Sequence, residues 1–334
     1  MPDVDRVNQI VMAAQLAAML EVSGWPKPGN VHRTMDLPDT RFEHFLAGAA
    51  AMGPALRSVA LNGMKAGRGI IEVSEIGVGK YVKQAIADVK ALHKGGNTHL
   101  GVVLLFIPLA AAAGKTYVEG GRITAQELRR NVREITRKTT PHDAAEVYDA
   151  ILMVSSVQEL GRISGIAAPD LYDKEARKKM FGEKISLYDV MKISSKWDTI
   201  ASEWATGMRI SFEVGYPTLS KVFRQTGDIN TATVHTFLTV LAGFPDTFIA
   251  RKVGLKEASD IKRAIEIGRR RIAWISKRAK NILDLGGLMT RAGRGALLGL
   301  DIVLHEARGE LNPGTSADLT AASLMIAILC GLRF

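Results

Sequence analysis

The side chains of this chain that could do chemistry gather in four short polar segments, each next to apolar sequence of helical character. The segments are Glu21–His32 (EVSGWPKPGNVH), Lys94–His99 (KGGNTH), Phe244–Phe248 (FPDTF) and Leu311–Asp318 (LNPGTSAD). Each is rich in glycine or proline and carries lysine, histidine, asparagine or aspartate, which are groups that bind phosphate or a divalent cation. This pattern indicates loops that could hold a phosphorylated ligand.

The first segment places Lys27 between two prolines, which prevent a helix from continuing and stiffen the backbone. Gly29 permits a turn or the close approach of a ligand. Such a loop could present Lys27 and its backbone N–H groups to a phosphate, with Asn30 and His32 as further donors. An ordinary turn after a helix would have the same composition. Asp36 follows and could hold a cation, cap a helix or lie at the surface.

The second segment stands directly before an apolar run, where the free N–H groups of a helix start can bind an anion. Asn97 and Thr98 could donate to that anion or serve as helix caps. His99 would be partly desolvated, because the helix that follows it is expected to be core. The segment therefore has a structural as well as a phosphate-binding interpretation.

The third and fourth segments each combine a carboxylate with a helix start. Asp246 could ligate Mg²⁺, exchange a proton or cap a helix, and Arg251 could meet a phosphate or lie in solvent. Asn312, Ser316 and Asp318 open another apolar helix. Asp318 could cap that helix or hold a cation that bridges phosphates.

The elements around these segments are predicted to be helices. Apolar residues recur at helical spacing over Val4–Val22, and Thr124, Thr140, Ser186 and Ser316 are typical of helix starts; Thr124 and Glu127 have the spacing of a capping box. Alternation of period two is scarce, and Gly101–Ile107 and Ile151–Val157 favour helix over strand. We therefore expect one all-α globular domain over residues 1–334, with a possible loop excursion at 161–184 and an active site formed by the loops between helices.

Composition limits the class of protein. The chain has 334 residues, a single cysteine and a formal net charge of +10, so it cannot form an internal disulfide or a cysteine-based zinc site. The N-terminus has no basic signal-peptide region, and the longest apolar stretch, Leu100–Ala113, is shorter than the roughly 20 residues of a membrane span. We expect a soluble, cytoplasmic protein without a membrane partner, and a homo-oligomer is possible. The basic clusters are short and lack interleaved aromatic residues, which makes a nucleic-acid partner unlikely.

Taken together, the four segments resemble the triphosphoribosyl-dephospho-CoA synthase family, also called the CitG/MdcB group. The matching motifs are P-K-P-G-N-V-H from Pro26, G-N-T-H from Gly96, P-D-T from Pro245 and N-P-G-T-S-A-D from Asn312, in the order of the family. The resemblance implies an all-helical transferase that joins ATP to dephospho-CoA. A ribose hydroxyl attacks the anomeric carbon of the ATP ribose and adenine leaves, so ATP is a ribosyl donor, with Mg²⁺ as the implied cofactor.

The residue types and the resemblance together suggest three sets of site residues. The catalytic set is His99, Asp246 and His32. The set for substrate phosphates is Lys27, Gly29, Asn30, Asn97, Thr98, Thr247, Arg251, Asn312, Gly314 and Ser316. The set for the metal is Asp36, Asp246 and Asp318.

The sequence also departs from the family pattern. Leu100 replaces a lysine after G-N-T-H, His32 replaces an aspartate, and Thr34–Asp39 replaces a G-A-H-x-D-M segment. The departures indicate a divergent branch, whose acceptor could be another cofactor precursor, such as one of the pterin type. Two further alternatives stay open at this point: a non-catalytic basic helical protein that binds nucleotides or nucleic acid, and a ribosyl-bond hydrolase that uses water as acceptor.

Overall fold

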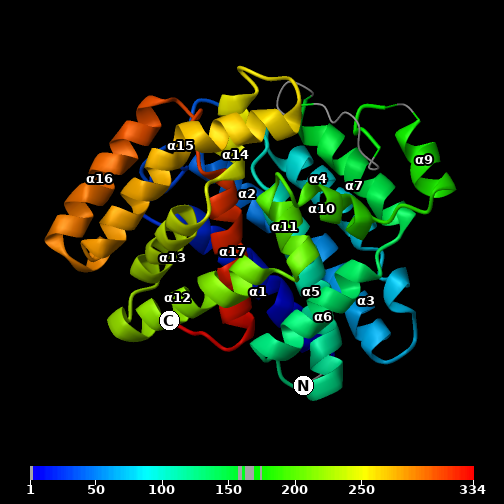
Figure 1. The fold of residues 1–334 in the computed structure, drawn as a ribbon. Helices are drawn as coiled ribbons and strands as arrows, with labels where there is room; N and C mark the ends of the chain where they lie inside the picture. Colours follow the sequence, from blue (N-terminus) through cyan, green and yellow to red (C-terminus); the bar gives the residue numbers. More distant parts are fainter. Residues whose placement is uncertain (1–2, 157–159, 162–168, 174) are drawn as a thin grey trace.

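Helix follows helix along the whole described chain, and the residues that can be placed contain no strand (Figure 1). The computed structural model describes residues 3–156, 160–161, 169–173 and 175–334. The predicted all-α class is confirmed. The α-helices are α1 (Asp3–Ser23), α2 (Phe42–Ala51), α3 (Gly53–Gly67), α4 (Val78–Leu92), α5 (Leu100–Gly120), α6 (Ala125–Arg137), α7 (Pro141–Val154), α9 (Ala176–Gly182), α10 (Leu187–Ser194), α11 (Thr199–Thr206), α12 (Tyr216–Thr226), α13 (Ile229–Gly243), α14 (Thr247–Gly254), α15 (Ile261–Asp284), α16 (Arg291–Glu306) and α17 (Gly314–Leu329). Short helical turns lie at Val73–Glu75, Ser211–Gly215 and Gly287–Met289.

Two apolar helices, α5 and α17, lie at the centre of the molecule. Helix α17, red in Figure 1, passes through the middle of the bundle and packs against α1, α5 and α13. Helix α5 packs against α3 and is buried from Val102 to Thr116. Because both helices are apolar around their whole circumference, they can only be stable inside a shell of other helices.

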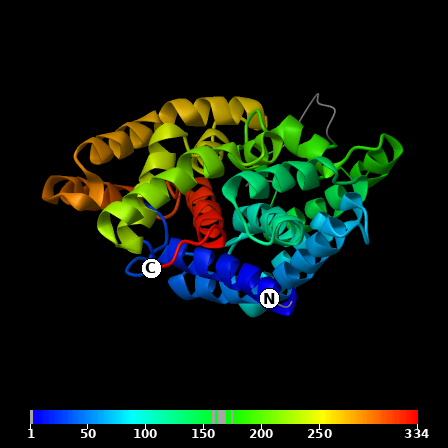
Figure 2. The same ribbon diagram turned by 90° about the horizontal axis from the view of Figure 1, so that it is seen from below.

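The shell divides into two regions with separate apolar cores. The larger core includes side chains of α1, α3, α4, α5, α7 and α17, and the smaller one lies under α13, α14, α15 and α16. Seen from below, α1 (dark blue) runs along one edge of the molecule and α15 (gold) along the opposite edge (Figure 2). The four polar segments lie at the ends of central helices: after α1, before α5, before α14 and before α17.

The predicted helix starts are mostly correct. Thr124, Thr140 and Ser186 each accept a backbone N–H three residues on, as an N-cap does. The expected reach of Glu127 to the Thr124 backbone is wrong, because its carboxylate instead accepts the hydroxyl of Thr124 at 2.7 Å. Helix α17 starts at Gly314, two residues before the predicted start at Ser316, and the Ser316 hydroxyl donates to Asp246 instead of capping the helix.

Part of the predicted excursion at 161–184, residues 162–168 and 174, lies outside the described residues. The described part contains α9, so it is not loop throughout. Among the described residues, α5 alone has the length and apolarity of a membrane span, because the helix continues past the 14-residue apolar stretch to Gly120. Of its most apolar window, 83% is buried inside the protein, as in the core helix of a soluble protein.

Candidate active site

The loop that follows α1 folds Lys27 into the interior of the protein. Lys27 is 0% exposed, and its Nζ donates to the Glu21 carbonyl oxygen at 2.8 Å and to the Glu21 carboxylate. Burial lowers the pKa of Lys27, and the negative charges of Glu21, Asp318 and Asp301 oppose this shift. The Lys27 side chain therefore lies near Glu21, six residues before it, and near carboxylates of α16 and α17, although the sequence suggested a direct contact with phosphate.

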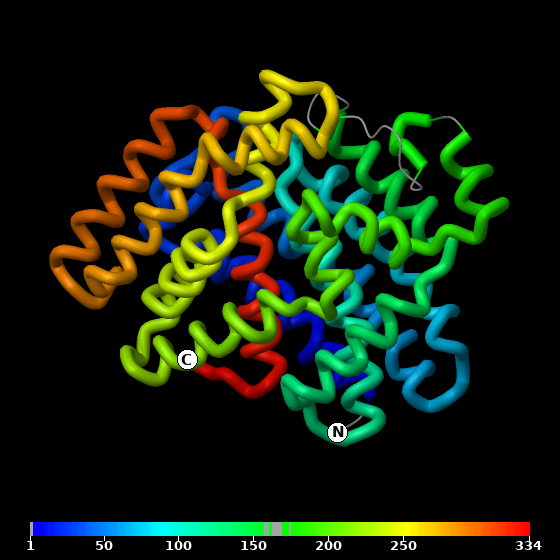
Figure 3. The backbone as a smooth tube through the Cα atoms, in the orientation of Figure 1, coloured from blue at the N-terminus to red at the C-terminus, as the bar shows by residue number. Residues whose placement is uncertain are grey.

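Gly29 lets the same loop pass directly over α16. Its φ is +71°, and a Cβ at this position would come within 2.6 Å of the Leu304 Cβ. The Gly29 N–H donates to Asp301 at 3.2 Å. One residue on, the Asn30 amide donates to the Asn312 side-chain oxygen at 2.8 Å, which joins the first polar segment to the fourth. Figure 3 shows these two segments, blue and orange-red, side by side.

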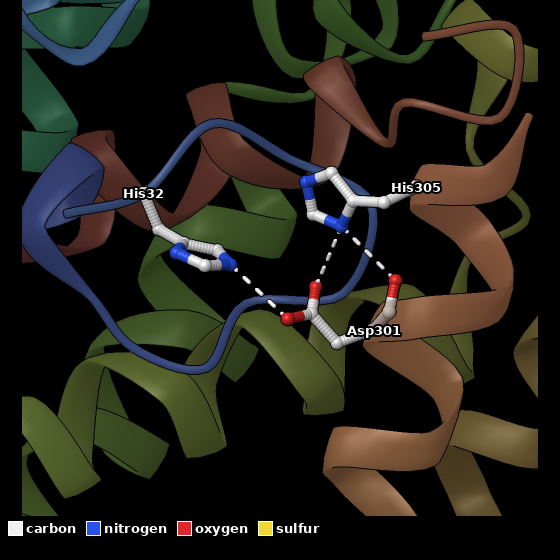
Figure 4. Close-up of side chains that lie close together, drawn as sticks. All are labelled: His32, Asp301 and His305. Atoms are coloured by element: carbon white, nitrogen blue, oxygen red, sulfur yellow. Dashed lines mark hydrogen bonds and ion pairs between the residues drawn. The ribbon is translucent and has the colours of Figure 1, made fainter. Parts of the chain in front are cut away.

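His32 ends the loop in a buried cluster with Asp301 and His305 of α16 (Figure 4). The Asp301 carboxylate lies between the two rings, 3.1 Å from His32 Nε2 and 2.9 Å from His305 Nδ1. Burial raises the pKa of Asp301, but its hydrogen bonds to the two histidines outweigh burial and lower it to about 2. Asp301 is therefore a carboxylate in this cluster.

Asp246 joins the third polar segment to the fourth. It is 2% exposed, and its Oδ1 accepts the N–H groups of Phe248 and Ile249 at the start of α14. Its Oδ2 accepts the Ser316 N–H at 2.7 Å and the Ser316 hydroxyl at 2.9 Å. Burial raises the pKa of Asp246, and these four bonds oppose the shift. The next side chain, Thr247, is buried and accepts the Thr199 N–H at 3.2 Å.

Asp318 lies where the other polar segments meet. Its carboxylate accepts the Val102 N–H, and a Cβ on Gly101 would fall 1.9 Å from its Oδ2, so Asp318 touches the start of α5. Burial raises the pKa of Asp318 well above its ordinary value, and the neighbouring negative charges of Glu21, Asp246 and Asp198 raise it further. Four acidic groups, Asp318, Glu21, Asp246 and Asp198, thus lie close enough to interact electrostatically.

Arg251 borders this acidic region from α14. Its guanidinium lies 3.6 Å from the Asp198 carboxylate and 5.5 Å from the centre of the Phe248 ring. Its Nε is buried and has no hydrogen-bond partner. A buried donor without a partner costs about 1–3 kcal/mol, so this nitrogen is suited to bind an anionic ligand.

The second polar segment directly precedes the turn of α5 that touches Asp318, but its histidine ring packs against α2. His99 is 2% exposed, and its Nδ1 lies 2.8 Å from the Thr98 hydroxyl, with the ring against Gly48 and Phe45 of α2. Burial lowers the pKa of His99 to about 3, and His93 contributes. Asn97 is exposed and accepts the Leu100 N–H at 3.2 Å, as a helix cap does.

Two further residues of the predicted sets have structural contacts. Asp36 is exposed and accepts the Phe42 N–H at 2.8 Å, which caps the start of α2. Gly314 is the first residue of α17 and packs against the Phe248 ring. A Cβ at this position would lie 3.1 Å from a carbon of that ring.

A cleft of about 370 Å³ lies beside His93–His99 and the end of α7.

The match to a known family covers almost the whole chain. Residues 7–333 match the CitG family, described as ATP:dephospho-CoA triphosphoribosyl transferase. The chain belongs to the CitG family. The predicted family is thus confirmed, and the family makes this protein a transferase of the triphosphoribosyl group of ATP.

Two relatives of this CitG protein show how far it has diverged. A 2-(5''-triphosphoribosyl)-3'-dephosphocoenzyme-A synthase of Klebsiella pneumoniae is 23% identical over 323 residues, which are 95% of this chain and 89% of the relative. The crystal structure of a provisionally named triphosphoribosyl-dephospho-CoA synthase from Archaeoglobus fulgidus matches with a TM-score of 0.58 and 24% identity. That match covers 86% of this chain and all of the other, and it shows that the fold is shared.

The sequence motifs missed several residues of the site. Glu21 was inside the first segment but was not selected, and Asp198, Asp301 and His305 lay outside all four segments. Asp301 and His305 are four residues apart and so share one face of a helix, a spacing that could have marked them as a pair. Asp198 carries no such local signal.

Proposed function

We propose that this CitG-family transferase moves the triphosphoribosyl group of ATP to a hydroxyl of dephospho-CoA, or of a similar cofactor precursor, around Asp318. One observation carries the proposal: the Asp318 carboxylate touches the start of α5 and lies within the electrostatic reach of Glu21 and Asp246. Groups from the first and third polar segments, and from the start of the helix that follows the second, therefore lie around one carboxylate of the fourth, as expected of a substrate site assembled from distant loops.

The reaction forms a bond between the acceptor oxygen and C1′ of the ATP ribose, while the bond from C1′ to adenine breaks. Adenine leaves with the electron pair of that bond and takes up a proton, and the acceptor hydroxyl loses one. Positive charge develops on the ribose ring in the transition state, as in glycoside cleavage. Carboxylates near C1′ favour that charge, and the acidic groups around Asp318 are suited to this role.

Arg251 is our candidate for holding the triphosphate. Its buried Nε is free to donate, and the ion pair with Asp198 is long at 3.6 Å, so a phosphate can compete for the guanidinium. Lys27 has a different role in this proposal. Because it is fully buried and bonded to Glu21, it sets the charge and position of Glu21 instead of reaching the substrate.

The residues around Asp318 fit a magnesium ion. Glu21, Asp246 and Asp198 raise the pKa of Asp318, and a divalent cation would relieve this repulsion between carboxylates. Asp318 and Glu21 would hold the ion, since each Asp246 oxygen already accepts two hydrogen bonds. Mg²⁺, when bound, would neutralise charge on the triphosphate. Asp36, which caps α2, has no part in this proposal.

The predicted proton carriers His99 and His32 are less suited than the sequence suggested. The His99 ring is buried against α2 and is neutral at pH 7, given its pKa of about 3. His32 is bonded to Asp301 through one ring nitrogen and faces Thr34 through the other. Their catalytic roles stay predictions, and Asp246 is proposed as a positioning residue for Ser316 and α17.

The test measures free adenine after incubation of the protein with ATP, MgCl₂ and dephospho-CoA. Adenine together with a product of the mass of triphosphoribosyl-dephospho-CoA is the expected result. Adenine release that requires a different acceptor would show that dephospho-CoA is not the acceptor substrate. Ribose triphosphate formed without any acceptor would indicate a hydrolase. ADP without adenine would contradict the proposal and favour a kinase or an ATPase.

A pair of variants connects this activity to the site. Asp318→Asn should lower adenine release at least about 100-fold, because the loss of a carboxylate next to the reacting charge costs several kcal/mol. Asp284→Asn is the matched control, since Asp284 is an exposed residue paired with Lys280 on α15. Equal activities of the two variants would exclude Asp318 from the site.

A further inference from the structure

The cluster of His32, Asp301 and His305 borders the acidic groups around Asp318, since Asp301 and Asp318 both act on the charge of Lys27, but no step of the proposed transfer uses it. We propose that these three side chains form a binding site for a divalent transition-metal ion of the zinc class. Two imidazoles and one carboxylate are a frequent protein ligand set for zinc, with a fourth position left for water or another ligand. This inference does not depend on the proposed function.

The spacing of the ligand atoms fits such an ion. The Asp301 carboxylate oxygens lie 3.1 Å from His32 Nε2 and 2.9 Å from His305 Nδ1, and ligand atoms of the three residues all lie within 4.8 Å of one another. Zinc bonds of about 2.0–2.1 Å in a tetrahedron separate neighbouring ligand atoms by roughly 3.3 Å. The two carboxylate-to-ring distances lie within a few tenths of an ångström of that separation, and the ring nitrogens, which are within 4.8 Å of each other, would move closer on binding.

The loop after α1 and helix α16 orient the three side chains of the cluster. Figure 4 shows His32 entering from the loop after α1, while Asp301 and His305 come from successive turns of α16. The Thr34 N–H and hydroxyl lie 3.4 and 3.2 Å from His32 Nδ1, so Thr34 holds the ring with Nε2 directed at Asp301. The Gly29 N–H, donated to Asp301 Oδ1, orients the carboxylate.

Unused polar atoms provide an independent argument. Nε2 of His305 is buried and makes no hydrogen bond of normal geometry, although the Asn30 backbone is near enough to favour its protonation slightly. On the same loop, the buried Oδ1 of Asn30 also has no partner. Groups of this kind are rare in folded proteins, and a bound ion or water is one of their explanations.

The alternative is a cluster held together by hydrogen bonds alone, which would attach the loop to α16 without any ion. The two cases differ in a measurable property. An ion-binding cluster takes up one equivalent of zinc and gains stability from it, because ligand binding to the folded state raises the melting temperature. A hydrogen-bonded cluster does neither.

The experiment uses the full-length protein without a histidine tag, treated with a chelator and then titrated with ZnCl₂ by calorimetry. We expect one site per chain and a melting temperature that rises with zinc concentration. CoCl₂ in place of zinc should give the visible absorption bands of a cobalt ion in a tetrahedral site. His305→Gln should weaken zinc binding at least about 10-fold.

His142→Gln is the matched control, because His142 is exposed at the start of α7 and should leave binding unchanged. If His305→Gln does not fold, the cobalt spectrum of the unaltered protein still decides the question. The absence of stoichiometric zinc binding, or a cobalt spectrum typical of the hydrated ion, would overturn the proposal. Equal zinc affinities of the His305 and His142 variants would also overturn it.

Discussion

Asp246 and Ser316 are 70 residues apart in sequence, yet Asp246 Oδ2 accepts both the backbone N–H and the hydroxyl of Ser316, at 2.7 and 2.9 Å. The same carboxylate caps α14 through its other oxygen. It therefore fixes the start of α14 against the start of α17. The placement of Asp318, two residues after Ser316, depends on this bond.

We predict that Asp246→Asn destabilises the protein by about 2–4 kcal/mol, because a buried amide nitrogen would face the Ser316 donors. Urea unfolding measures the change. Asp228→Asn is the control: Asp228 caps α13 in the same way but at the surface, so this variant should cost little, because asparagine caps a helix about as well as aspartate. Equal costs would mean that the link to Ser316 contributes nothing to stability.

The buried pair of Lys27 and Glu21 predicts a large coupling energy. Lys27→Met leaves the Glu21 carboxylate without its partner in the interior and should cost about 3–5 kcal/mol. The double variant Lys27→Met/Glu21→Gln should recover most of that loss, because no unpaired charge then remains. A thermodynamic cycle of the four proteins, measured by urea unfolding, checks this; additive effects would contradict the pairing.

Gly29 is predicted to tolerate no side chain, for two reasons that can be separated. Gly29→Ala forces an alanine to adopt a φ of +71° and also places its Cβ 2.6 Å from Leu304 Cβ. We expect a loss of at least about 3 kcal/mol from strain and overpacking together. Gly121→Ala has the same φ with open space around it, so it should cost only about 1–2 kcal/mol.

His99 should make the protein less stable in mild acid. Burial and the charge of His93 lower its pKa to about 3 in the folded state, against 6.5 in the unfolded chain. Between these two values the unfolded state binds more protons, so stability rises with pH and is complete above about pH 6.5. At pH 5 the free energy of unfolding is therefore ~2 kcal/mol lower than at neutral pH because of His99 alone.

Unfolding free energies at pH 7 and pH 5 test this expectation. The difference between the two pH values should be smaller in His99→Gln than in the unaltered protein, whatever the overall stability of the variant. It should not disappear, because burial also lowers the pKa of His93 and His235. His142→Gln should leave the difference unchanged, since that side chain is exposed.

The sequence by itself determined the fold class, the helix starts and the family. Helical spacing over Val4–Val22 and the caps at Thr140 and Ser186 depend on residues within a few positions of one another, so they can be read locally. The motifs also marked Asp246, Asp318 and Arg251. The oligomeric state, the cytoplasmic location and the catalytic roles of His32 and His99 stay predictions.

Only the tertiary structure decided the partners of these residues. Lys27 looked like an exposed phosphate ligand, but the packing of its loop on α16 buries it and pairs it with Glu21. Asp301 and His305 acquire a third member, His32, from a loop almost 270 residues away. Contacts of this kind depend on how apolar helices pack in three dimensions, and no local pattern in the sequence specifies them.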